Sequence, residues 1–147
     1  MGDERIVNAK NRVFYSDGLG VGRNNPISLH TSSEYVYRLT GMDQIADILE
    51  CGYVRPKKGK VRGGHKNEVF WSLGGEKKFY FDGYPVLEAP ADMVKDEQIG
   101  AISIMNLTGI WIFDKVQNKY INRIDYFKEM YQEKNNGLIN QDNGFSR

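Results

Sequence analysis

Apolar and polar residues alternate most clearly in "SEYVYRLT", residues 33–40. One set of alternate side chains comprises Tyr35, Tyr37 and Leu39. The set between them comprises Val36, Arg38 and Thr40. A period of two is typical of a β-strand that has one face toward the core, so this segment is the first predicted strand.

The residues that follow, 40–52 ("TGMDQIADILECG"), change to helical spacing. Thr40 is the predicted N-cap, because a threonine hydroxyl commonly bonds the first free backbone N–H groups, and Asp43 follows three residues later. Gly52 is a typical C-terminal stop. The predicted apolar face consists of Met42, Ile45, Ala46 and Leu49.

Further short apolar segments predict the rest of a sheet. They are "EVFWS" (68–72), "YPVLEAP" (84–90), "IGAISIM" (99–105) and "GIWIFD" (109–114), the last two as a strand pair. Residues 74–83 fit either a strand or one helical turn. Near-helical spacing in "KYINRIDYFKEMYQEK" (119–134) predicts a C-terminal helix. The order predicts an α+β fold, with an antiparallel or mixed sheet of about five to six strands, one internal helix and a C-terminal helix.

The chain is predicted to form a single domain, because 147 residues suffice for one hydrophobic core. Residues 1–31 contain Asp-Gly, glycine and Asn-Asn-Pro breakers, and we expect an irregular N-terminal arm there. Residues 32–134 form the predicted α+β domain. Residues 135–147 are polar and contain glycine, so they are predicted to be a disordered tail.

Composition excludes several classes of protein. The 20 Lys and Arg residues nearly balance the 19 Asp and Glu residues, so no global field would attract nucleic acid or a membrane. The single cysteine, Cys51, cannot form an internal disulfide, and no Cys/His spacing predicts a metal site. The start, "MGDERIVNAK", has no apolar run, so we expect neither a signal peptide nor a membrane span.

One segment is strongly basic. Between Cys51 and Asn67 there is no acidic residue, and His65 lies among six Lys or Arg residues. The six are Arg55, Lys57, Lys58, Lys60, Arg62 and Lys66. Glycines in the segment let its backbone approach a ligand closely, and together with the cations they suit a phosphate or diphosphate group. The glycine spacing is neither that of a P-loop nor that of a dinucleotide-binding turn, and a solvated loop without a ligand is the alternative interpretation.

The pattern "VYRLTGMDQIADILECGYVRP…NEVFWSLGG…YPVLEAP" resembles the core of the ADP-ribosyltransferase-like fold found among bacterial toxin and effector domains. The resemblance covers residues 34–90 and concerns the arrangement of elements. In that family a first strand carries Arg or His, a helix and a glycine-containing loop follow, a second strand carries an aromatic residue and Ser or Tyr, and a late strand carries Glu. The resemblance implies an enzyme that consumes NAD by breaking the bond between nicotinamide and ribose.

The resemblance also implies a role for each matching residue. Arg38 would hold the diphosphate of NAD, since a guanidinium makes paired hydrogen bonds to phosphate oxygens. Ser72 would be the second-strand serine of the catalytic set. Glu88 would bind a ribose hydroxyl and stabilise the positive charge that develops as nicotinamide leaves. Other residues expected to contact NAD are Thr40, Trp71 or Phe70, Tyr80, Tyr84, Arg62, His65 and Lys66.

Two positions depart from the family's pattern. Position 86 is Val, where the family often has a second Glu or Gln, so transfer to a protein side chain would lack its usual helper. His30 is a rival for the first-strand residue, as in the family's His-Tyr-Glu branch, with Tyr80 or Tyr84 as the tyrosine. Either Arg38 or His30 as the first-strand residue predicts NAD chemistry, but the choice of His30 places the predicted site at other residues.

Two other functions remain open. A small ribonuclease toxin needs a cationic surface and groups that move protons at the RNA 2′-hydroxyl. The residues available for that chemistry are His65, Lys66, Arg62, Arg38, Tyr80 and Tyr84. A non-catalytic binding module would instead use its aromatic residues, 12% of the chain, for core and interface.

The resemblance to toxin domains also implies partners. These are a neutralising immunity protein and a protein or nucleic-acid target docked on residues 55–66. Neither a metal nor a membrane is an expected partner. The expected location is the cytoplasm, or a target cell into which a larger toxin delivers the chain.

Overall fold

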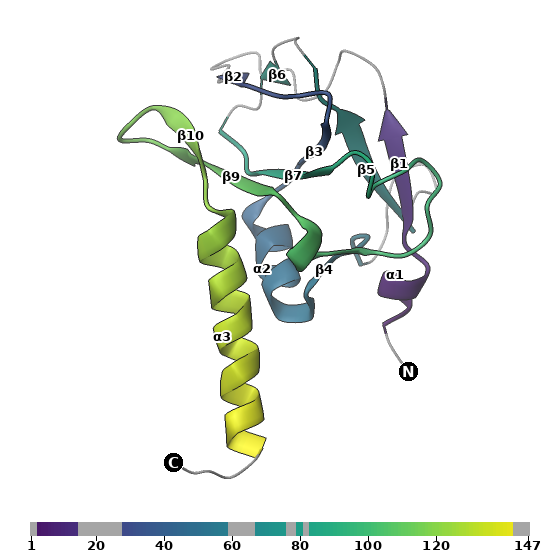
Figure 1. Cartoon of the computed structure of the whole chain (residues 1–147), viewed down its shortest axis with the longest axis vertical. Coiled ribbons are helices and arrows are strands. Elements are labelled where there is room, and N and C mark those ends of the chain that lie inside the picture. The colour runs from purple at the N-terminus through teal and green to yellow at the C-terminus, as the bar shows by residue number, and fades with distance from the viewer. Residues whose placement is uncertain (1–2, 15–27, 59–66, 76–78, 81–82, 143–147) are drawn as a thin grey trace.

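The computed structural model describes residues 3–14, 28–58, 67–75, 79–80 and 83–142, and a mixed sheet forms its centre (Figure 1). Within these residues six strands of this sheet lie in the order β1-β5-β3-β7-β9-β10. They are β1 (Lys10–Phe14), β5 (Glu68–Leu73), β3 (Tyr35–Leu39), β7 (Val86–Pro90), β9 (Gly109–Asp114) and β10 (Lys119–Asn122). β1 pairs with β5 in parallel, and the other neighbouring strands are antiparallel.

Helices and short strand pairs surround this sheet. Within the described segments, β2 (Ser28–Leu29) pairs with β6 (Phe79–Tyr80), and β4 (Tyr53–Val54) pairs with β8 (Ile102–Ser103). The helical elements are α1 (Glu4–Val7), α2 (Met42–Cys51), the 3-10 turn η2 (Ile104–Asn106) and α3 (Ile124–Asp142). The predicted fold class is confirmed, because these elements form one α+β domain with a mixed sheet, an internal helix and a C-terminal helix.

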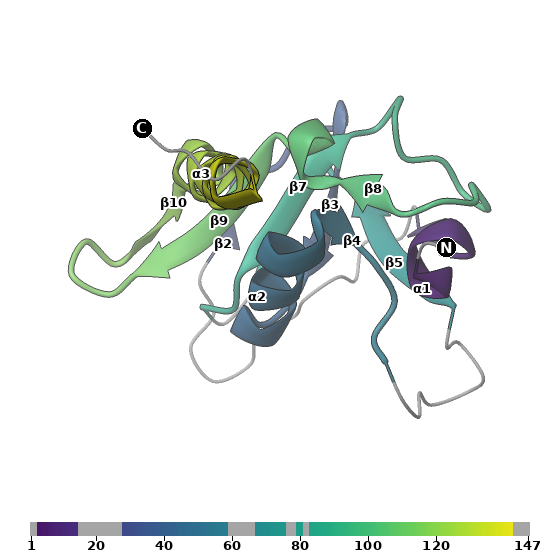
Figure 2. The ribbon, with the colours of Figure 1, turned by 90° about the horizontal axis from the view of Figure 1, so that it is seen from below.

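The alternation of β3 separates the two faces of the sheet. One face is covered by α2 and α3, which lie on the same side of the sheet in Figures 1 and 2. The buried core on this face includes Val36, Trp71, Leu87 and Ile110 of the sheet with Ile45 and Ile48 of α2. The smaller core on the other face contains Leu29, Tyr37, Val86 and Tyr120. Neighbouring residues of β3 therefore belong to separate cores.

The register of β3 also aligns three polar groups on the second face. Tyr37 lies opposite Ser72 of β5 and opposite Glu88 of β7. Directly paired residues of neighbouring strands have their side chains on the same face, so these three side chains form a row across the sheet. Arg38 follows Tyr37 in β3 and has the opposite orientation, because its guanidinium bonds Gln44 of α2.

Both ends of the chain are more regular than the sequence predicts. The predicted irregular arm contains β1, which forms one edge of the main sheet. Asn11 holds this strand in place, because its buried side chain donates to the carbonyl oxygens of Gln98 (3.2 Å) and Gly100 (2.9 Å). These partners are distant in sequence, so the local sequence pattern does not show that this segment joins the edge of the sheet. Residues 15–27 of the arm lie outside the described part of the chain.

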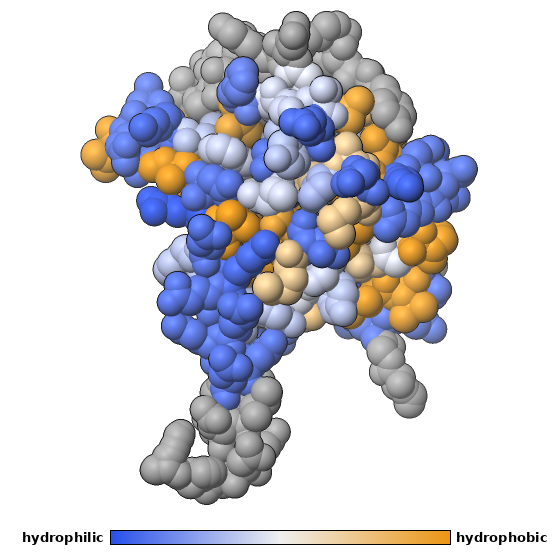
Figure 3. All heavy atoms as spheres, viewed as in Figure 1, coloured by the Kyte–Doolittle hydropathy of each residue, from blue (hydrophilic) through white to orange (hydrophobic). Residues whose placement is uncertain are grey.

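The C-terminal helix extends into the predicted disordered tail. α3 runs to Asp142, and residues 143–147 lie outside the described part of the chain. Ile124 and Phe127 anchor the first turn in the core, and the face of the described helix that Figure 3 shows is mostly hydrophilic. A helix anchored at one end can extend into solvent, because adding a turn is easier than starting a helix.

The predicted pairing of residues 99–105 with residues 109–114 is wrong. The first segment provides only the short strand β8, which pairs with β4, and then forms η2. β9 pairs instead with β7 and β10. The turn between β9 and β10 is set by the Asp114 carboxylate, which accepts hydrogen bonds from the N–H groups of Val116 (2.8 Å) and Gln117 (3.0 Å).

The C-terminal helix also begins later than its apolar spacing predicts. Residues 119–122 form β10, and α3 begins at Ile124. The Asn122 side-chain oxygen accepts hydrogen bonds from the N–H groups of Ile110 (3.2 Å) and Ile124 (3.0 Å). This one side chain thus ties the end of the strand to the start of the helix.

Helix α2 has Gly41 as its N-cap in place of the predicted Thr40. No side chain caps this end of the helix, because the Thr40 hydroxyl donates to Gln44 Oε1 (2.7 Å). The side chains that α2 buries are Ile45 and Ile48, whereas the predicted apolar positions Met42 and Ala46 are exposed. Gly52 ends the helix in the left-handed conformation (φ 86°), which confirms its predicted role.

We predict that Gly52→Ala lowers the free energy of unfolding by about 2 kcal/mol or more. An L-residue is strained at φ 86°, and an added Cβ would overlap the Tyr131 hydroxyl of α3. Urea denaturation measures the change. Gly75→Ala is the control, with an expected effect below about 0.5 kcal/mol, because no heavy atom lies within 4 Å of an added Cβ there. Equal losses in the two variants would contradict the prediction.

Candidate functional site

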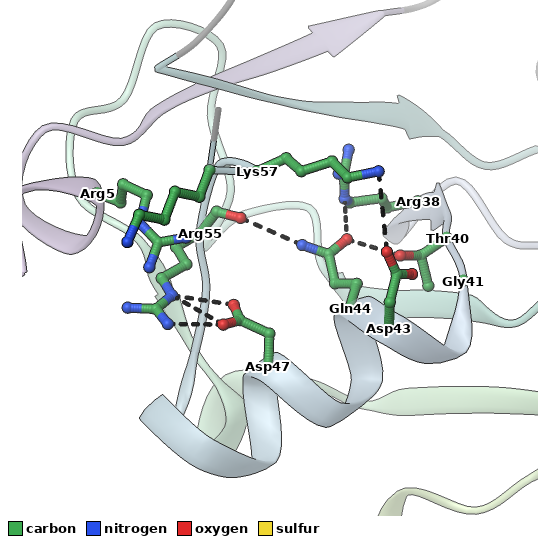
Figure 4. Close-up of a pocket in the computed structure, with 10 residues that line it drawn as sticks. Arg5, Arg38, Thr40, Gly41, Asp43, Gln44, Asp47, Arg55 and Lys57 are labelled. Atoms are coloured by element: carbon green, nitrogen blue, oxygen red, sulfur yellow. Dashed lines mark hydrogen bonds and ion pairs between the residues drawn. The ribbon is translucent and has the colours of Figure 1, made fainter. Parts of the chain in front are cut away.

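A pocket of about 330 Å³ lies between α2 and the segment that follows β4 (Figure 4). This volume is within the range of small-molecule sites. The cationic side chains that line it are Arg5, Arg38, Arg55, Lys57 and Lys58. The acidic side chains that line it are Asp43 and Asp47. Cations therefore outnumber carboxylates in the pocket lining.

Arg38 is a partly buried cation of this lining. Its Nε donates to Gln44 Oε1 (2.8 Å) and its Nη1 donates to the carbonyl oxygen of Phe70 (3.2 Å), and both acceptors are neutral. Among the described residues no carboxylate forms an ion pair with Arg38. Burial lowers the pKa of Arg38 to about 10, so the guanidinium stays protonated at neutral pH. The pocket thus contains a partly buried positive charge that no carboxylate of the described segments pairs with.

Arg55 contrasts with Arg38, because carboxylates surround it. Its Nε donates to Asp47 Oδ2 (2.9 Å) and its Nη2 donates to Asp47 Oδ1 (2.6 Å). Its Nη1 also donates to Asp3, which in turn accepts from Arg5 Nη2 (3.0 Å). The bonds to Asp47 raise the pKa of Arg55 above its usual value. Arg55 therefore forms part of the pocket wall and links α1 to α2, and the carboxylates of Asp47 and Asp3 balance its charge.

The remaining lysines stand at the rim. Lys57 Nζ lies 3.8 Å from Asp43 Oδ2, and both side chains are more than 70% exposed. An exposed ion pair at this distance contributes little to stability, so Lys57 can leave Asp43 and bind an incoming anion at a small cost in free energy. Lys58 is exposed as well. The N-terminus of α2 is also at the pocket, through Gly41, and the positive end of its helix dipole favours an anion there.

The predicted catalytic residues divide between the two faces of the sheet. Arg38 and Thr40 line the pocket beside α2. Ser72 and Glu88 lie together on the opposite face, on either side of Tyr37. The structure thus places Ser72 and Glu88 on the same face, with Tyr37 between them, and separates both from Arg38 by the thickness of the sheet.

Glu88 is buried within the row that crosses the sheet. Glu88 is 8% exposed, and its Oε1 accepts a hydrogen bond from the Thr108 hydroxyl (2.8 Å). Burial raises the pKa of the Tyr37 hydroxyl, and the neighbouring Glu88 carboxylate adds to this shift. Tyr37 Oη also accepts a hydrogen bond from the Ser32 N–H (3.2 Å). These polar groups form a buried network on the face away from the pocket.

The aromatic residues predicted to contact NAD do not gather at the pocket. Trp71 is fully buried in the main core, where its Nε1 donates to Asn11 Oδ1 (3.1 Å), and Phe70 stacks on Phe14. Tyr84 is 56% exposed and does not line the pocket. The rival residue His30 follows β2 outside the first central strand, and it is exposed. Of the other predicted contacts, Arg62, His65, Lys66 and the side chain of Tyr80 lie outside the described part of the chain.

The sequence does not single out three residues that shape the pocket. Gln44 and Asp47 of α2 bind Arg38 and Arg55 respectively, and Asp3, at the start of the N-terminal helix, contacts Arg55. Gln44 and Asp47 are three residues apart, so they lie on one face of α2, and this spacing is the signal that identifies them. Asp3 has no such signal, because it lies 52 residues from Arg55 in sequence.

No family model, no curated protein and no solved structure matches this chain. In the segments that the structure describes, no helix combines the length and the apolar character needed to cross a membrane. Those segments also contain no group of three or more His, Cys, Asp or Glu side chains positioned to hold a metal ion. The case for a function therefore depends on the geometry and charge of the pocket.

We predict that Arg55→Met lowers the free energy of unfolding by about 2 kcal/mol, because Asp47 and Asp3 lose their cation. Arg38→Met is predicted to change it by less than about 1 kcal/mol, because removing a desolvated charge offsets two lost hydrogen bonds to neutral acceptors. Chemical denaturation at neutral pH measures both. A loss for Arg38→Met as large as that for Arg55→Met would make Arg38 a structural cation.

Proposed function

We propose that the chain binds NAD through its diphosphate in the pocket beside α2 and breaks the bond between nicotinamide and ribose, as an ADP-ribosyltransferase-like enzyme. The observation that carries the proposal is the charge of Arg38, which only neutral groups contact within the described residues. The resemblance of residues 34–90 to that family supplies the nucleotide and the class of reaction.

The hydrogen bonds of Arg38 leave part of its guanidinium available to a ligand. A guanidinium has five N–H donors, and the bonds to Gln44 and Phe70 use one on Nε and one on Nη1. The remaining donors on Nη1 and Nη2 match the spacing of two phosphate oxygens. A phosphate there would supply the counter-charge that no carboxylate in the described part of the chain supplies to Arg38.

The rim of the pocket suits the approach of a nucleotide. Lys57 and Lys58 are exposed, so their charges attract a diphosphate before it reaches Arg38. Such attraction raises the association rate and falls with added salt. Binding of NAD is therefore expected to weaken at high ionic strength.

The proposed reaction needs a carboxylate beside the ribose. As nicotinamide leaves, positive charge develops at the ribose carbon, and water then completes the products ADP-ribose, nicotinamide and a proton. Glu88 is the carboxylate that the resemblance implies, but its face of the sheet is opposite that of Arg38. Asp43 lines the same pocket as Arg38 and has an exposed side chain, so it is the second candidate for this role.

Nicotinamide release from NAD tests the proposal. The wild-type protein is expected to release nicotinamide, and removing the charge of the acting carboxylate, by Glu88→Gln or Asp43→Asn, is expected to slow the release at least about tenfold. Asp92→Asn is the control, because Asp92 is exposed and does not line this pocket.

The outcomes separate the parts of the proposal. No release by folded wild-type protein at millimolar NAD would contradict NAD cleavage. Release by the wild type at a rate that neither Glu88→Gln nor Asp43→Asn reduces would contradict the proposed carboxylate role of both residues. Slow release by Asp43→Asn alone would assign the step to the pocket beside α2.

A further inference from the structure

We infer that Gln44 is the positioning residue that makes the pocket beside α2 selective for anions, because it holds Arg38 in place with a neutral oxygen. The inference rests on the proposed function, since it concerns the same pocket and the same ligand charge. Gln44 acts through Arg38, and it would not itself need to touch the nucleotide.

The Gln44 side chain connects three elements of the pocket (Figure 4). Its Oε1 accepts hydrogen bonds from Arg38 Nε (2.8 Å) at the end of β3 and from the Thr40 hydroxyl (2.7 Å). Its Nε2 donates to the carbonyl oxygen of Arg55 (3.2 Å). The orientation of the amide follows from its partners, because Arg38 can only donate and the Arg55 carbonyl can only accept.

Only an amide satisfies all of these partners without cancelling the charge of Arg38. A glutamate has the same shape, but it would pair with Arg38, offset its charge and place a negative charge where the phosphate is expected. It would also face the carbonyl oxygen of Arg55 with an acceptor in place of a donor. A methionine would leave Arg38 Nε without its acceptor.

The second arginine of the pocket shows what a carboxylate does in this setting. Asp47 lies on the same face of α2, three residues after Gln44, and it makes two short hydrogen bonds to Arg55. Arg55 is thereby neutralised and fixed in the wall. Gln44, an amide one turn earlier, holds Arg38 Nε with one hydrogen bond and leaves the charge of Arg38 available to a ligand.

Binding of ADP-ribose and of inorganic pyrophosphate, followed by calorimetry, tests the inference. We expect Gln44→Glu to weaken both affinities at least about tenfold, because a like charge now opposes the phosphate. Gln44→Met is expected to weaken them less, about fivefold, because only the hydrogen bond that orients Arg38 is lost. Ala46→Glu is the control, since it adds the same charge to an exposed position of α2, and its expected change is less than about twofold.

Comparing the melting temperature with the affinity separates an effect on ligand binding from a loss of structure. The ion pair that Gln44→Glu forms with the Arg38 guanidinium is expected to outweigh the lost hydrogen bond to the Arg55 carbonyl oxygen, so the melting temperature should equal or exceed that of the wild type while the affinity falls. A parallel fall in melting temperature and affinity would contradict the inference, because it would indicate lost structure.

The binding results also distinguish failure of the inference from failure of the proposed function. If the wild type binds neither ADP-ribose nor pyrophosphate, the proposed function is wrong and the inference falls with it. If the wild type binds them and Gln44→Glu binds them as tightly, or if Ala46→Glu weakens binding as much, only the inference about Gln44 is overturned.

Discussion

The alternation of side chains along β3 is the constraint on which the rest of the molecule depends. This strand lies inside the sheet, and its neighbouring residues Tyr37 and Arg38 belong to opposite faces. Tyr37 enters a buried polar row with Ser72 and Glu88, whereas Arg38 reaches α2 and the pocket. One strand thus supports two polar sites whose side chains cannot meet, because the sheet lies between them.

Arg38 and Arg55, which both line the pocket, show how the same residue type takes separate roles. Arg55 is bound by Asp47 and Asp3, so its interactions join the N-terminal helix to α2. Arg38 has only neutral partners among the described residues, and burial lowers its pKa to about 10. A desolvated charge without a counter-charge opposes folding, and perturbed groups of this kind cluster at functional sites. This contrast is the physical basis for placing the ligand at Arg38.

Local sequence patterns predict much of the fold. Of the predicted site residues, Arg38 and Thr40 line the pocket, whereas Ser72 and Glu88 do not. The alternation of residues 35–39 and the stop at Gly52 predict β3 and the end of α2 without reference to the rest of the chain. By contrast, β1 depends on bonds from Asn11 to residues 98 and 100, which no local pattern reports. The placement of Ser72 and Glu88 is likewise not predictable from local pattern. The face of the sheet that they occupy follows from strand register, and a register shift of one residue would place their side chains on the other face.

Binding of a diphosphate at Arg38 can be followed through the Nε–Hε resonance of Arg38 in a ¹H–¹⁵N spectrum, identified by its loss in Arg38→Lys. We expect this resonance to shift saturably as NAD is added, because phosphate oxygens bind the same guanidinium. Adenosine, which has no phosphate, is predicted to leave it in place. An Arg38 resonance that stays unmoved at millimolar NAD, or that moves equally with adenosine, would contradict the claim that this pocket binds the diphosphate.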